Sequence, residues 1–107
     1  MEPQAIQQAI DAIEQATDKA VEQLKNGQAD AALKSAVQDL HQQSRTKRAL
    51  TDPKALEQAA LDIEKAADKA MEACRAAGQV EPALQQAVKD AHQKASQLKH
   101  QVQGTAA

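Results

Sequence analysis

The sequence predicts an all-α protein: an antiparallel up-down-up-down four-helix bundle built from a duplicated helical hairpin. Three observations predict this fold. Apolar residues recur at alternating spacings of four and three residues, which places them along one face of a helix. Residues 13–22 return almost unchanged as residues 63–72. Glycine and proline residues separate the helical segments at the positions where helices commonly end and begin.

Composition limits the kind of core that this bundle can have. A chain of 107 residues has the size of one domain, which we place at residues 1–107. It contains no Phe, Tyr or Trp, so it lacks the side chains that bury the most apolar surface. Alanine, leucine, isoleucine and valine must fill the core instead. A core of such side chains requires close helix packing or a partner subunit.

The first predicted helix spans residues 3–26. Pro3 fits its first turn, where a missing backbone N–H loses no hydrogen bond. Asn26 and Gly27 can adopt the backbone angles that end a helix. Its apolar or small residues share one face: Ile6, Ile10, Ile13, Thr17, Ala20 and Leu24.

The second predicted helix spans residues 30–48. It begins at Asp30, whose carboxylate can accept hydrogen bonds from the free N–H groups of the first turn. Its inward face carries Leu33, Val37, Leu40 and Ser44. The same spacing places Lys47 on the inward face, so we expect the helix to leave the core there and to fray toward Leu50.

The third and fourth predicted helices span residues 53–77 and 82–102. Asp52 is the expected N-cap of the third helix, and Gly78 ends that helix as Gly27 ends the first. The inward residues of the third helix are Leu56, Ala60, Ile63, Ala67, Ala70 and Cys74. Those of the fourth are Leu84, Val88, Ala91, Ala95, Leu98 and Val102. Residues 104–107 are expected to form a tail.

The two halves, residues 3–50 and 53–102, align as repeats. Polar residues and turn glycines recur together with the apolar residues, which a shared helical period alone does not explain. Small residues line one flank of the predicted helices: Ala9, Ala16, Ala36, Ala59, Ala66 and Ala87. Because small side chains allow close helix approach, we assign this flank to the contact between the hairpins. The opposite flank then lies along the contact inside each hairpin.

Glu14 and His41 lie on that second flank, at about equal distances from the turn that joins their helices, and Glu64 and His92 repeat the arrangement. One interpretation is a symmetric carboxylate and imidazole site that binds a transition metal or relays protons. The other is a pair of hydrogen bonds between helices at the edge of the bundle. The Glu-x-x-His spacing typical of metal-binding bundles is absent, which favours the structural interpretation.

Two groups of charged residues have similar alternatives. Asp11, Glu14, Asp18 and Glu22 form an acidic strip that can collect a cation or a basic partner, although a solvated helix face is the more common case. A basic cluster, Arg45, Lys47 and Arg48, is the predicted partner-binding site. Cations also stabilise the C-terminal end of a helix without any further role.

The functional prediction is a protein-interaction or scaffolding module whose partner is another protein or a second copy of the chain in a homodimer. The alternative is a metal- or small-ligand-binding bundle that uses the two Glu/His pairs. We predict no catalytic residues, no enzyme activity and no cofactor, because phosphate loops and nucleophile motifs are absent. The net charge of −2 argues against nucleic acid as a partner. No apolar run suggests a membrane span or a signal peptide, so the expected location is cytoplasmic.

Overall fold

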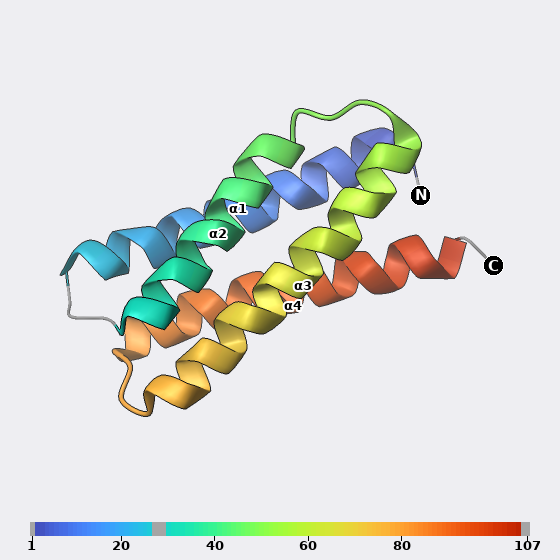
Figure 1. Ribbon diagram of the computed structural model, residues 1–107. Coiled ribbons are helices and arrows are strands. Elements are labelled where there is room, and N and C mark those ends of the chain that lie inside the picture. The colour runs from blue at the N-terminus through green and yellow to red at the C-terminus, as the bar shows by residue number, and fades with distance from the viewer. Residues whose placement is uncertain (1, 27–29, 106–107) are drawn as a thin grey trace.

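The computed structural model describes residues 2–26 and 30–105, and its four helices form an antiparallel bundle (Figure 1). The helices are α1 (Pro3–Asn26), α2 (Ala31–Lys47), α3 (Pro53–Ala77) and α4 (Pro82–Thr105). Over the described ranges no residue is in a β-strand. The predicted all-α four-helix fold is therefore confirmed.

The helices are arranged as two hairpins that pack side by side. α1 contacts both α2 and α4, and α3 contacts the same two helices. The N-terminal end of α1, the C-terminal end of α4 and the α2–α3 linker all lie at one end of the bundle, while the α3–α4 turn lies at the other (Figure 1). The molecule measures 41 × 23 × 17 Å. Among the described residues, no helix combines the length and apolar character needed to span a membrane.

The helix ends follow the predicted signals with one correction and one difference. Asp52 accepts a hydrogen bond from the backbone N–H of Ala55 at 3.0 Å, whereas Asp30 makes no such side-chain bond to α2. Gly78 ends α3 with a φ of 78°, which favours glycine. The predicted tail is wrong in its first residues, because α4 continues through Gly104 to Thr105. A glycine weakens a helix by about 1 kcal/mol but does not end it. The turn residue Gly27 lies outside the described residues.

The core consists of the residues that the periodicity places inward. Ile13 and Ile63 are both fully buried, and so is Val37. The other largest buried side chains are Ile6, Ile10, Leu33, Leu40, Leu56, Val88 and Leu98. Two hydroxyl residues, Thr17 and Ser44, are also fully buried, and both donate to carbonyl oxygens of their own helices. The inner surface of the first hairpin is therefore partly polar.

The alanine flank lies at the contacts between the hairpins. Ala9 of α1 lines a surface depression together with Leu98 of α4. Ala66 of α3 lines another together with Lys47 of α2. α2 ends at Lys47, where the helix is expected to leave the core. Lys47 itself is partly buried, and its Nζ lies 3.2 Å from Oδ2 of Asp62 on α3. This ion pair lets a charged residue occupy an inward position.

Candidate functional site

Three side chains that can bind a metal ion meet between α1 and α2. Glu14 and Asp18 lie one turn apart on α1, so they share the side of the helix that faces α2. His41 of α2 points its Nε2 at both: the distance is 2.5 Å to Oδ1 of Asp18 and 3.5 Å to Oε1 of Glu14. One ligand atom from each of the three residues lies within 4.8 Å of the other two. We call this group the Glu14–Asp18–His41 cluster.

The cluster lies at the edge of the core rather than inside it. Only 8% of the Glu14 side chain is exposed, compared with 17% for His41 and 54% for Asp18. Glu14 therefore approaches from the buried side and Asp18 from the solvent side. A carboxylate as buried as Glu14 must be hydrogen-bonded or paired with a positive charge, because burial of an isolated charge is costly.

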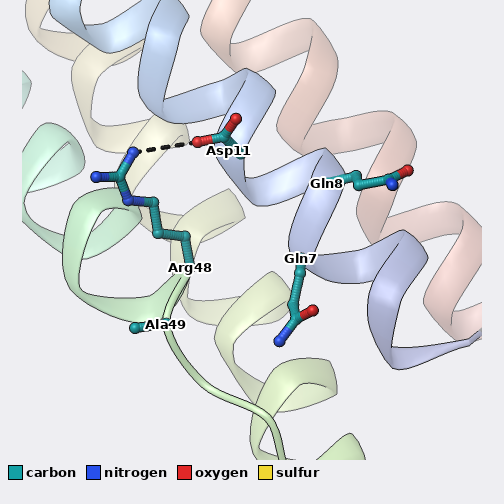
Figure 2. A pocket seen from close by; sticks show the side chains of 5 residues that line it. All are labelled: Gln7, Gln8, Asp11, Arg48 and Ala49. Atoms are coloured by element: carbon teal, nitrogen blue, oxygen red, sulfur yellow. Dashed lines mark hydrogen bonds and ion pairs between the residues drawn. The ribbon is translucent and has the colours of Figure 1, made fainter.

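Arg48 supplies that positive charge. Its Nη1 lies 3.2 Å from Oε2 of Glu14 and 3.1 Å from Oδ1 of Asp11, so one guanidinium nitrogen joins two carboxylates. Figure 2 shows Arg48 extending from the end of α2 toward Asp11 on α1, beside a depression of about 420 Å³. Nearby, Nε2 of Gln7 donates to the carbonyl oxygen of Leu50 at 2.6 Å and fastens the α2–α3 linker to α1.

The charges around the cluster do not balance. Asp11, Glu14 and Asp18 supply three carboxylates, and within the described residues Arg48 is the one permanently charged side chain that pairs with them. Three negative charges against one positive charge leave two negative charges when His41 is neutral. A divalent cation held by the cluster would neutralise this excess at the edge of a low-dielectric core.

The equivalent residues of the second hairpin form separate pairs. Nε2 of His92 on α4 lies 2.7 Å from Oδ1 of Asp68 on α3, and this contact corresponds to the 2.5 Å contact between His41 and Asp18. Glu64, in contrast, pairs with Lys99 at 3.4 Å. Across residues 30–105, no ion pair joins Glu64 to His92, and no three metal-binding side chains converge in this hairpin.

Comparisons with family models, with curated proteins and with solved structures found no match to this chain. The function must therefore be inferred from the chemistry of the residues themselves. The structure pairs Glu14 with His41, one of the two Glu/His pairs singled out in the sequence, whereas no ion pair joins Glu64 to His92 within the described residues. Asp18 was visible only as part of the acidic strip, where a solvated helix face was the favoured interpretation.

The basic cluster is largely occupied within the molecule. Lys47 pairs with Asp62, and Arg48 pairs with Asp11 and Glu14. Arg45 is exposed and forms no ion pair within the described part of the chain. Of the three predicted partner-binding residues, only Arg45 is free to meet a partner without breaking an internal contact.

Cys74 does not add a reactive group. It is buried on α3, and burial raises the pKa of its thiol against a smaller lowering effect of Lys89. A thiol that stays protonated near neutral pH is a poor nucleophile and a poor metal ligand. This agrees with the inward position that the apolar spacing of the third predicted helix assigns to Cys74.

Proposed function

We propose that the protein binds a divalent transition-metal ion through Glu14, Asp18 and His41. The observation that supports this proposal is the convergence of one imidazole nitrogen and two carboxylate oxygens within 4.8 Å, with ligands from two helices. An imidazole with two carboxylates suits Zn²⁺, Mn²⁺, Fe²⁺ or Co²⁺ better than a soft ion such as Cu⁺. We take Zn²⁺ as the probe.

The distances require only small side-chain movements for binding. Nitrogen and oxygen ligands lie about 2.0–2.2 Å from Zn²⁺, which places two ligands of a tetrahedral site about 3.3–3.6 Å apart. His41 and Glu14 are already separated by 3.5 Å. His41 and Asp18 are hydrogen-bonded at 2.5 Å, so the ion would replace the shared proton and push these two atoms apart by about 1 Å. Asp18 is half-exposed and has room to move.

Three protein ligands leave one position of a tetrahedral ion open. In zinc proteins this position is taken by water or by a ligand from solution. The exposed side of Asp18 gives that position access to solvent. The site would therefore suit reversible binding of an ion more than a closed structural role.

The test is a Zn²⁺ titration of the metal-free protein, followed by calorimetry and by thermal melting. We expect one ion per chain. At Zn²⁺ concentrations about 100-fold above Kd, binding to the native state alone stabilises the fold by about 2.7 kcal/mol. For a domain of this size the melting temperature should rise by about 10 °C. Binding should weaken in acid, because the ligands must be deprotonated to coordinate the ion.

The second hairpin offers a matched control. His41→Gln should abolish the melting shift, whereas His92→Gln should leave it unchanged, because among the described residues His92 pairs with one carboxylate, that of Asp68. An equal shift in wild type and in His41→Gln would show that Zn²⁺ binds elsewhere. No shift in wild type at high Zn²⁺ would refute the proposal.

A protein-interaction or scaffolding role is the second proposal, and exposed Arg45 is the observation that favours it. No large hydrophobic side chain is exposed on the described surface, so an apolar interface is not supported. A partner or a second copy of the chain would have to be recognised by charge. We expect Arg45→Glu to weaken such binding and Lys25→Glu, an exposed control on α1, to leave it unchanged. Sedimentation at several protein concentrations and salt strengths tests for the homodimer.

A further inference from the structure

We infer that Asp11 and Arg48 position Glu14 for metal binding, and that this pair determines which of the two hairpins has a metal site. The inference rests on the proposed function. It concerns residues that would not touch the ion. Arg48 contacts Oε2 of Glu14, whereas His41 faces Oε1 of the same carboxylate. The guanidinium therefore holds one oxygen and leaves the other directed toward the imidazole.

Asp11 holds Arg48 in this position. The Nη1 nitrogen carries two hydrogens, and it lies within hydrogen-bond distance of one oxygen of Asp11 and one of Glu14. A planar guanidinium with two partners on the same helix has little freedom to rotate. Its contact anchors Oε2 of Glu14, whose side chain is only 8% exposed and therefore has little room to move.

Asp11 also compensates the positive charge of Arg48 beside the proposed metal site. A positive charge beside a metal site lowers the affinity for a cation. The Asp11 carboxylate offsets the charge of Arg48, so the pair is neutral as a unit. It can orient Glu14 without adding net repulsion toward the ion. Ligating carboxylates in metal proteins are commonly held by such outer hydrogen bonds.

The second hairpin has neither residue. Leu61 aligns with Asp11, and Lys99 aligns with Arg48. Lys99 contacts Glu64 through one nitrogen at 3.4 Å, as Arg48 contacts Glu14 through one nitrogen at 3.2 Å. The difference lies in the second partner: Arg48 also pairs with Asp11, whereas no second carboxylate within the described residues pairs with Lys99. The charge of Lys99 is therefore not offset, which disfavours a cation at Glu64.

The experiment exchanges the two residues between the hairpins. Asp11→Leu with Arg48→Lys makes the first hairpin resemble the second, and we expect the Zn²⁺ affinity to fall about 10–100-fold. Leu61→Asp with Lys99→Arg makes the second resemble the first. We expect this variant to bind two ions per chain instead of one. Leu61 is only partly buried, as Asp11 is, so the fold should accept the change.

The readouts separate positioning from folding. Circular dichroism and melting without metal show whether each variant folds, and calorimetry measures affinity and stoichiometry on the folded protein. Adding His92→Gln to the Leu61→Asp, Lys99→Arg variant should remove the second site. If wild type binds one ion but both exchange variants keep its affinity and its single site, the inference is overturned and the proposed function stands. If wild type binds none, the proposed function itself has failed.

Discussion

The two hairpins share the same helix arrangement, but the residues at their aligned positions differ in polarity. Thr17 and Ser44 are fully buried in the first hairpin, where the second has Ala67 and Ala95. Both hydroxyls bond to carbonyl oxygens of their own helices. In the structure as described, no buried side-chain nitrogen or oxygen lacks a partner. The first hairpin therefore carries extra polar groups that are locally satisfied.

The same difference appears at the contacts between the hairpins. On one side, Lys47 of α2 pairs with Asp62 of α3. On the other side, the matched residues are Leu98 of α4 and Ala12 of α1, which line a common depression. An apolar contact and an ion pair thus occupy equivalent places in one bundle. The repeated apolar pattern therefore determines how the helices pack, while single substitutions determine where charged side chains lie.

Truncation of matched core isoleucines should cause the greatest loss of stability, and it tests whether the two hairpins pack equivalently. Ile13→Ala and Ile63→Ala each remove a fully buried side chain at matched positions. Each should lower the free energy of unfolding by about 2–5 kcal/mol, from lost burial and the cavity left behind. Urea denaturation measures both. If the two losses of unfolding free energy differ by more than about 2 kcal/mol, one hairpin relaxes around the cavity and the two hairpins do not pack equivalently.

The next effect concerns the buried hydroxyl of Ser44. Ser44→Ala should raise stability by up to about 1 kcal/mol, because alanine is the better helix former and Leu40 keeps its backbone bond. Ala95→Ser should lower it by about 1–2 kcal/mol, because it buries a new hydroxyl. Thermal melting of both variants tests the pair. A stabilised Ala95→Ser protein would contradict the idea that polarity in the first hairpin costs stability.

The helix caps offer a smaller contrast between hairpins. Asp52→Ala removes the bond from the N–H of Ala55 and should cost about 1 kcal/mol. Asp30→Ala should cost less, because Asp30 makes no side-chain cap bond to α2. Denaturation midpoints of the two variants give the comparison. Equal losses would mean that charge near the helix end, rather than the hydrogen bond, provides the stabilisation.

The smallest effect is the pH dependence of the Lys47–Asp62 pair. The pKa of Asp62 is lowered, mainly by a hydrogen bond from Gln58 and also by Lys47. A lowered folded-state pKa means that the stabilisation is present above pH 3.8 and is lost as pH falls through the folded-state value. Asp62 is 38% exposed, so Asp62→Asn should cost under about 1 kcal/mol at neutral pH.

The stability of this variant and that of wild type should converge as pH falls through the folded-state pKa of Asp62, because its carboxyl is then protonated. Melting curves at neutral pH and at acid pH check this expectation. A difference of the same size at the two pH values would show that Asp62 acts through packing or helix propensity and not through its charge.

Periodicity predicted the fold because burial of apolar faces decides the packing of these helices. The helical spacing places Ile13 and Ile63 on the apolar faces of their helices, and these faces must be buried in the core. The proximity of Glu14 and His41 followed equally from their levels in the hairpin. These properties depend on backbone geometry, which the spacing of residues determines.

The charged contacts were harder to predict because they depend on which long side chain reaches which partner. Glu64 and His92 occupy the same levels as Glu14 and His41, yet each is paired elsewhere. Arg48 was predicted to bind a partner protein, but in the structure it forms an ion pair with Glu14 of the same chain. Several rotamers of such side chains have similar energies in isolation, and only the assembled surroundings select one.

The contacts between the hairpins have a consequence for how the two halves can vary. α1 contacts α4 as α3 contacts α2, so the arrangement has the approximate twofold symmetry of a dimer of hairpins. In a true homodimer every substitution appears twice, on both sides of the axis. Joining the halves through the α2–α3 linker removes that constraint. A buried hydroxyl such as Ser44, or a guanidinium such as Arg48, can then be carried by one half alone while the other keeps an apolar core.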